Sequence, residues 1–199
     1  RADVKVTNCV FNNNTAKNGT AIRNYAPGTK IPQITGCLFS NNTATYNGSV
    51  YSTGYDVSDA NFSNCTFYNN QQLPTEKLFD NAGHINIRNS VFGNDRIYDD
   101  GSLSTQFTLR NCLIDQPAFI GNSNVITADP LFINSSDPAG ADDIFGTADD
   151  GLQLQSSSSA IDQGDTTGIG STIPATDLRS NTRIYNNLID MGAYEQQTS

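Results

Sequence analysis

The sequence predicts an all-β protein: a right-handed parallel β-helix, or solenoid, of about five coils, followed by a loop-rich C-terminal cap. Three observations favour this fold class. A short phrase recurs at the spacing of a solenoid coil, strand-like alternation precedes it, and Asn or Gly holds one place in it. The handedness is the general one for parallel crossovers. We expect the coils over residues 1–128 and the capping module over residues 129–199.

The repeated phrase reads apolar, polar, Asn or Gly, Cys or Ser, any residue, apolar. Its fourth position is held by Cys9, Cys37, Cys65, Ser90 and Cys112, so the phrase returns at a nearly regular interval that shortens toward its last copies. A period of roughly 20–45 residues is typical of a solenoid, in which each repeat buries its apolar face against its neighbours. We therefore expect these five residues to stand in one column.

Each phrase can be read as a strand that ends in a sharp corner. Alternating apolar residues, such as Ile85 and Ile87, are typical of a strand with one buried face. Asn and Gly tolerate the left-handed backbone conformation that a one-residue corner requires. The corner residues are Asn8, Gly36, Asn64, Asn89 and Asn111. Further asparagines later in each coil predict ladders in which each amide bonds to the coils above and below.

The composition narrows the class of protein. The chain has 199 residues, of which 36% are hydrophobic and 24 are Asn, which is too polar for a helical bundle. Its formal net charge of −9 disfavours a nucleic-acid partner, because the average surface would repel a polyanion. No apolar stretch reaches the roughly 18 residues of a membrane span, so we expect no membrane insertion.

The first residues already alternate like a strand, from Val4 to Val6, so we expect more protein upstream. An uncovered terminal coil would be a pairing edge that invites association. We expect this coil to meet upstream β-helix coils or another chain end to end. At the other end, we expect the module from residue 129 to cover the last coil.

The four cysteines admit two interpretations. An exported protein with an even number of cysteines can pair them, and neighbouring coils, about 4.8 Å apart, lie within the Cα separation of a disulfide. In-register neighbours, however, point their side chains the same way, which favours a column of free, buried thiols. No Cys/His spacing indicates a zinc site.

Two features carry a resemblance to a known family. The Asn-Cys-x-Phe phrase is followed by Asn-x-Thr-Ala at residues 13–16, and five further blocks occur in order in the tail. Those blocks are residues 128–132, 151–154, 159–164, 177–183 and 190–195. Together they resemble bacterial surface proteins of the pectate-lyase-like β-helix superfamily that end in a module of the choice-of-anchor Q type. The resemblance implies export to the cell surface and brings no catalytic residues.

An acidic loop is the best candidate site. Residues 137–151 hold three glycines and five carboxylates, those of Asp137, Asp142, Asp143, Asp149 and Asp150. Unpaired carboxylates this close repel one another, and a hard cation bound by six to eight oxygens relieves the repulsion. We therefore predict a calcium site, although the spacing is not that of an EF-hand. A solvated Asp/Gly turn loop is the alternative.

Other candidate residues carry weaker signals. His84, the only histidine, shares a strand face with Arg88, but a lone surface histidine is commoner. Asp99 and Asp100 match the paired acids of glycoside hydrolases in type, but adjacent residues on a strand point to opposite faces, so a turn is favoured. Five tyrosines could stack on sugar rings or simply pack: Tyr25, Tyr46, Tyr51, Tyr55 and Tyr68.

Three function classes remain. The favoured one is a non-catalytic extracellular or cell-surface β-helix, an adhesin, stalk or matrix component that calcium stabilises and that contacts a polysaccharide or a surface protein. The alternative is a carbohydrate-active enzyme or fragment, a polysaccharide lyase or glycoside hydrolase, or a glycan-binding module. An ice-binding face is the weakest, because Thr43-Ala44-Thr45 does not recur at the coil period. We expect that the protein is not an enzyme.

Overall fold

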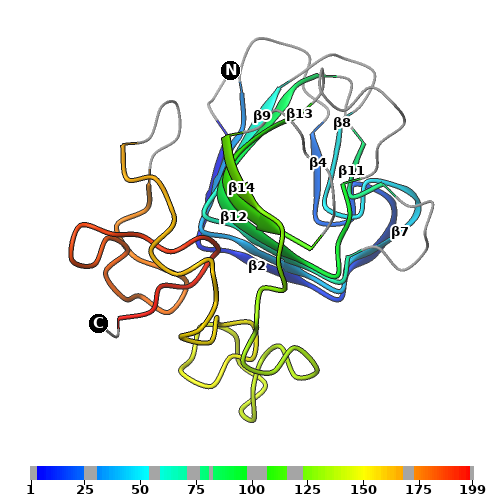
Figure 1. Ribbon diagram of the computed structural model, residues 1–199. Coiled ribbons are helices and arrows are strands. Elements are labelled where there is room, and N and C mark those ends of the chain that lie inside the picture. Colours follow the sequence, from blue (N-terminus) through cyan, green and yellow to red (C-terminus); the bar gives the residue numbers. More distant parts are fainter. Residues whose placement is uncertain are drawn as a thin grey trace.

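The computed structural model describes residues 4–24, 31–53, 59–70, 77–80, 83–97, 107–115, 123–167 and 173–197. The described residues form strands, turns and bends and include no helix. This part of the chain therefore has no helix that could span a membrane. Every pairing between named strands is parallel. The largest sheet curls into a half-barrel, and the two smaller sheets lie across its open side (Figure 1). The all-β, parallel prediction is confirmed at this level.

The strands fall into three sheets. A nine-stranded sheet has the order β1-β5-β9-β12-β10-β6-β2, with β13 beside β12 and β14 beside β13. A three-stranded sheet has the order β11-β8-β4, and β3 pairs with β7. The bounds in the large sheet are β1 Lys5–Thr7, β2 Val10–Asn12, β5 Gln33–Thr35, β6 Leu38–Ser40, β9 Ala60–Ser63, β10 Thr66–Tyr68, β12 Ile85–Gly93, β13 Phe107–Ile114 and β14 Ser123–Ile126. Those in the small sheets are β3 Thr15–Asn18, β4 Ile22–Asn24, β7 Thr43–Asn47, β8 Tyr51–Thr53 and β11 Phe79–Asp80.

The five phrases lie side by side in register. Val6 pairs with Ile34, which pairs with Phe62, and the row continues through Ile87 to Leu109. We call these units repeats 1 to 5, after Cys9, Cys37, Cys65, Ser90 and Cys112. The predicted column is confirmed, since Ser90 pairs with Cys112 and the residue after each of Cys37, Cys65 and Ser90 donates its amide to the carbonyl of the preceding column member. A further strand, β14, pairs Ile126 with Leu113 after a shorter stretch of chain than separates any two of the phrases.

The predicted corners have left-handed backbone. The corner φ values are 48° at Asn8, 64° at Gly36, 52° at Asn64, 47° at Asn89 and 49° at Asn111. A second corner in repeats 1 to 4 is left-handed too, at Asn13, Asn41, Asn69 and Asn94. An L-residue with a Cβ branch is strained there, which explains why the phrase accepts only Asn and Gly.

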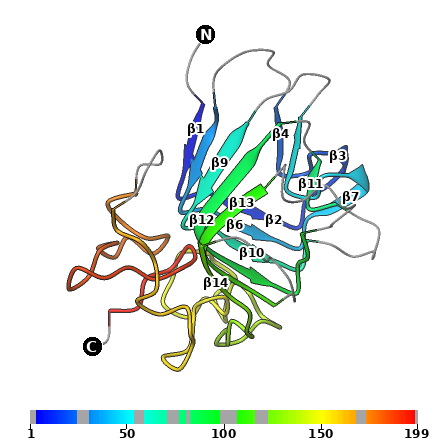
Figure 2. The ribbon, with the colours of Figure 1, turned by 45° about the horizontal axis from the view of Figure 1, so that its top comes forward.

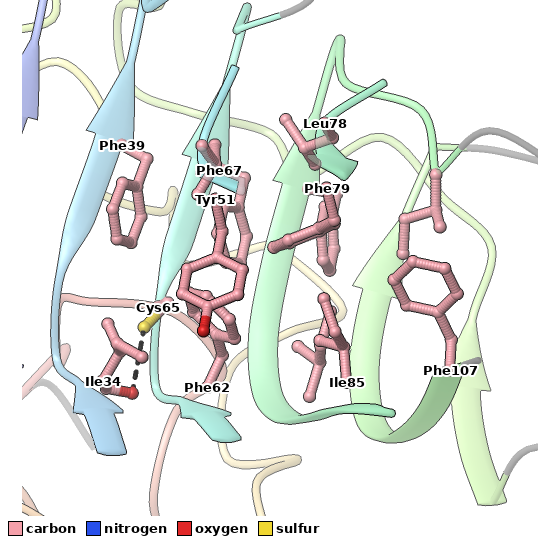
Figure 3. Close-up of a cluster of buried hydrophobic side chains, with 14 of the residues drawn as sticks. Ile34, Phe39, Tyr51, Phe62, Cys65, Phe67, Leu78, Phe79, Ile85 and Phe107 are labelled. Carbon is pink, nitrogen blue, oxygen red and sulfur yellow. Dashed lines mark hydrogen bonds between the residues drawn. The ribbon is translucent and has the colours of Figure 1, made fainter. Parts of the chain in front are cut away.

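Side chains of the same type stack along the axis of the repeats. Phe11, Phe39, Phe67 and Phe92 lie in one stack, with ring centroids 5.0, 5.3 and 4.5 Å apart. Figure 3 shows the ring of Phe62 and neighbouring side chains filling the space inside the curled sheet. The column cysteines are free, as we predicted, and their thiols donate to backbone carbonyls. Burial raises the pKa of the Cys37 and Cys112 thiols to about 12, which leaves them unreactive near neutral pH.

The predicted asparagine ladders are also present. The Asn14 side-chain amide donates to Asn42 Oδ1 at 2.9 Å, and Asn42 donates to Asn70 Oδ1 at 2.8 Å. Asn70 donates to Asp95 Oδ2 at 2.6 Å, so a carboxylate holds the place of the asparagine in repeat 4. Because Asn42, Asn70 and Asp95 are buried, each bond replaces one that water would otherwise supply.

The C-terminal region packs along the flank of the repeats. We expected it to cover the last coil, but its described contacts run from Asn8 in repeat 1 to Asn111 in repeat 5. Figures 1 and 2 both show it outside the curled sheet. Outward apolar residues of neighbouring repeats, Leu38, Val91 and Leu113, are buried there against the module. Apolar burial therefore joins the two regions side to side.

Candidate functional site

The acidic loop of residues 137–151 folds as a series of turns on the outer side of the C-terminal region. Three of its five predicted residues converge on one point, the hydroxyl of Thr147. The Thr147 Oγ lies 2.7 Å from Asp149 Oδ1, 3.4 Å from Asp150 Oδ1 and 3.5 Å from Asp142 Oδ1. The carbonyl oxygen of Ile144 lies 3.1 Å away. A hydroxyl has one proton, so it can satisfy only one of these four acceptors at a time.

Backbone amides support the same carboxylates. The Asp142 Oδ1 accepts a hydrogen bond from the amide of Ile144, and the Asp150 Oδ2 accepts one from Gly146 at 2.7 Å. The hydrogen bond from Thr147 and those from nearby amides lower the pKa of Asp149, so this carboxyl is ionised near neutral pH. The Asp149 charge therefore lies beside the same hydroxyl that the Asp142 and Asp150 oxygens approach.

The other two predicted residues lie outside this convergence. Asp143 is exposed and has left-handed backbone, with φ 56°. Asp137 contributes its backbone, since its carbonyl accepts from Gly140 and its amide donates to Asn134. A Cβ on Gly140 would lie 2.4 Å from the carbonyl oxygen of Asp149, so this glycine permits the close approach of the two ends of the loop.

The oxygen ligands of the loop are of the type that calcium binds, although they are not arranged around a preformed metal site. Carboxylate, carbonyl and hydroxyl oxygens are the ligands that this cation takes, at about 2.3–2.6 Å. Within the described part of the chain, no group of three or more His, Cys, Asp or Glu side chains is arranged to hold a metal ion. The oxygens surround a hydroxyl rather than a common centre, so binding would require Asp142 and Asp150 to move inward.

The acidic loop is tied to the surface that contacts the repeats. Asp150 is fully buried, and its Oδ2 accepts a hydrogen bond of 2.7 Å from the Tyr194 hydroxyl. The two residues before Tyr194 reach the repeats directly. The amide of Ala193 donates to Thr66 Oγ1 and that of Gly192 donates to the Asn89 carbonyl, at 2.9 and 2.8 Å. Asp150 thus supports the segment that joins the module to repeats 3 and 4.

A buried charged cluster was missed by the sequence analysis. Arg183 and three acids, Asp177, Asp190 and Glu195, are each at most 1% exposed. The Arg183 guanidinium donates to the carbonyls of Asp190 and Gly192, and its Nε lies 3.8 Å from Glu195 Oε2. The cluster thereby shapes the loop that docks on Thr66. The only sequence feature that marked these four residues was their position in the last two tail blocks, residues 177–183 and 190–195.

Burial shifts two acids of this cluster, Glu195 and Asp190, toward their neutral forms. Desolvation, with repulsion from Asp190, raises the pKa of Glu195 to about 8. Desolvation also raises the pKa of Asp190. Arg183 opposes both shifts, but it faces more than one carboxylate. The cluster therefore holds more acid than its single cation can balance.

The remaining candidates divide into packed, bonded and undescribed residues. His84 Nε2 lies 2.7 Å from Thr108 Oγ1, whereas Arg88 pairs with Asp165, so the two have separate partners. Asp99, Asp100, Tyr25 and Tyr55 lie outside the described residues. Tyr51 is buried in the core, and Tyr68 packs edge-on against Phe132. Tyr46 is exposed.

Comparison with known proteins adds no relative. No protein-family model matches the chain, and no curated protein sequence matches it significantly.

Proposed function

We propose that the chain is a non-catalytic extracellular or cell-surface protein, built as a right-handed parallel β-helix of about five coils with a flanking module of the choice-of-anchor Q type. One observation carries the proposal: the repeated polar side chains bond to the same residue type in the next repeat, as along Asn14, Asn42 and Asn70. The hydrogen bonds of such ladders join neighbouring repeats and stiffen the stack along its axis. A stiff rod with a polar surface suits a stalk, an adhesin or a matrix component.

Two measurements test this proposal. The purified chain is incubated with neutral and acidic polysaccharides, and reducing ends and unsaturated products are followed. We expect no turnover, and release of either product would refute the non-catalytic role in favour of a polysaccharide lyase or glycoside hydrolase. Antibody labelling of intact source cells is expected to detect the protein on the surface; labelling only after lysis would refute the location.

Calcium is part of the proposal. The ion would be held by the carboxylates of Asp142, Asp149 and Asp150, together with the Ile144 carbonyl and the Thr147 hydroxyl. It would contact all of these oxygens at once, whereas the Thr147 proton can bond to only one of its acceptors at a time. The ion would relieve the repulsion between the carboxylates. Asp137 and Asp143 would add charge nearby without joining the convergence.

Thermal melting with excess calcium and with a chelator tests the site. We expect calcium to raise the melting midpoint of the wild type but not of Asp149→Asn. Asp129→Asn is the matched control, because Asp129, like Asp149, is exposed and accepts a hydrogen bond from a backbone amide, in its case that of Leu131. A wild-type midpoint that calcium leaves unchanged would refute the site.

The first repeat supports an end-to-end contact. Val6, Cys9 and Phe11 are only partly buried, whereas their counterparts in repeat 2 are fully buried. Upstream coils or a second chain seated on β1 and β2 would bury them and pair the strand edges. Sedimentation velocity over a range of concentrations tests a second chain. A monomer at all concentrations would refute the contact with a second chain.

A further inference from the structure

One exposed aromatic side chain stands apart from the other described tyrosines of the repeats. Tyr51 and Tyr68 are used in packing, but Tyr46 is 65% exposed, the highest value among the exposed large apolar and aromatic residues. Transferring a ring of this size from water into an apolar contact lowers the free energy. In the folded chain most of the Tyr46 ring stays in water, so a ligand could still provide this stabilisation.

A bulge presents this ring. In the pairing of β3 with β7, Ala16 lies opposite Ala44 but Asn18 lies opposite Asn47, so one extra residue is inserted in β7. Lys17 therefore faces two residues, Thr45 and Tyr46. Bulges re-aim side chains and are common beside functional sites. Here both Thr45 and Tyr46 are exposed.

The ring has a cation beside it, and the two strands that carry them hold exposed hydroxyl residues. The Lys17 Nζ lies 5.9 Å from the centre of the Tyr46 ring, within the range of a cation–π contact. The exposed hydroxyl residues Thr15 and Thr45 lie on the same two strands. An aromatic face with hydroxyl and ammonium donors beside it matches a sugar ring that carries an acidic substituent.

The charge distribution favours an anionic ligand here. Residues 111–199 hold twelve Asp and Glu but only two Lys and Arg, whereas residues 1–110 hold eight and nine. Figures 1 and 2 both show β7 on the side of the repeats away from the C-terminal region. Because repulsion between separated charges is screened within about 10 Å, the acidic module does not oppose an anion at Lys17.

We propose that Tyr46 and Lys17 form a binding subsite for a carboxylated polysaccharide. A pyranose ring stacks on Tyr46, its carboxylate pairs with Lys17, and its hydroxyls bond to Thr15 and Thr45. This inference rests on the proposed function, in which a polysaccharide is a partner, and it names the surface and the chemistry that the partner must have.

Native affinity electrophoresis tests the subsite with two polymers of one backbone, carboxymethyl cellulose and hydroxyethyl cellulose. We expect the wild type to be retarded by carboxymethyl cellulose, and less by hydroxyethyl cellulose. This retardation acts against the net charge of −9, so simple attraction to the polymer does not cause it. A wild type that carboxymethyl cellulose does not retard would overturn the proposal.

Variants separate the two contributions. Tyr46→Ala is expected to weaken retardation about five- to tenfold in both gels, while Tyr46→Phe keeps it. Lys17→Gln is expected to bind both polymers alike. Leu188→Ala, at an exposed residue of the module, is the control and should match the wild type. Wild-type retardation of Tyr46→Ala would overturn the subsite, whereas turnover of either polymer would instead contradict the non-catalytic function.

Discussion

The repeats and the C-terminal module satisfy their buried polar groups in opposite ways. In the repeats, Asn42 donates to Asn70 and accepts from Asn14, so one residue type serves as its own partner. In the module, Arg183 donates to two backbone carbonyls and forms an ion pair with Glu195, and each of these contacts occurs once. A repeated contact tolerates the loss of one member better than a unique one does. The module should therefore be the more easily broken region.

The largest effect is expected from Arg183→Met. Removing this buried cation leaves Glu195 and Asp190 without their counter-charge, so we expect unfolding free energy to fall by about 4 kcal/mol. Urea unfolding measures the change. Arg179→Met is the control, because the Arg179 side chain is 20% exposed and should cost about 1 kcal/mol. Equal losses for the two variants would contradict the role of the buried cluster.

The ladder of the repeats is tested by Asn42→Ala. This change removes the side-chain acceptor of Asn14 and the donor that Asn42 supplies to the Phe11 carbonyl, and it leaves Asn70 Oδ1 with only the backbone amide of residue 42. The loss of these bonds should cost about 3 kcal/mol. Asn94→Gly is the control, since the Asn94 amide makes one exposed bond to Asn69 and Gly fits the left-handed backbone there. If both variants unfold at the same urea concentration, the ladder does not stabilise the repeats.

The acids of the module predict a pH dependence of its stability. The pKa of Glu195 is about 8 in the folded protein and near 4.5 when unfolded, so the folded state binds more protons between these values. The stability that protonated Glu195 contributes to the folded state is fully present below about pH 4.5 and is lost as the pH rises through 8. We expect the wild type to lose about 2 kcal/mol from pH 5 to 8 relative to Glu195→Gln. Parallel stability curves for the two proteins would contradict this assignment.

The smallest effect is expected at the boundary between the regions. Asn89 exchanges two hydrogen bonds with Asp165 of the module, whereas neither side-chain polar atom of the buried Asn64 has a hydrogen-bond partner. Both corners are left-handed, so Gly fits either. Asn64→Gly should change stability by about 0.5 kcal/mol or less, and Asn89→Gly should cost about 1 kcal/mol. Thermal melting that ranks them in the reverse order would refute this difference.

The repeats could be predicted from the sequence because their geometry imposes one local requirement many times. Each corner demands left-handed backbone, and Asn8, Asn64 and Asn111 show it at one place in the phrase. The corner at Asn124 was missed because β14 follows β13 too closely to match the period of the phrases. A local rule is visible in sequence only where its spacing is kept.

The module could not be predicted to the same depth because its contacts join residues that share no pattern. Arg183 looks like a surface charge in the sequence, and only the fold shows it buried. In the acidic loop, five aspartates were equivalent in sequence, but turns bring only Asp142, Asp149 and Asp150 to Thr147. The bulge that exposes Tyr46 likewise depends on pairing with β3, a strand of the preceding repeat.

The unequal lengths of the repeats have a practical consequence. The paired rows stay aligned although the last two repeats follow their predecessors at shorter intervals than repeats 2 and 3 do. Length is therefore absorbed in the connections, such as the one between Gly93 at the end of β12 and Phe107 at the start of β13. An epitope or reporter peptide grafted into that connection, beyond the buried Asp95 and Ile97, should leave the paired rows undisturbed, so foreign sequence could be displayed there.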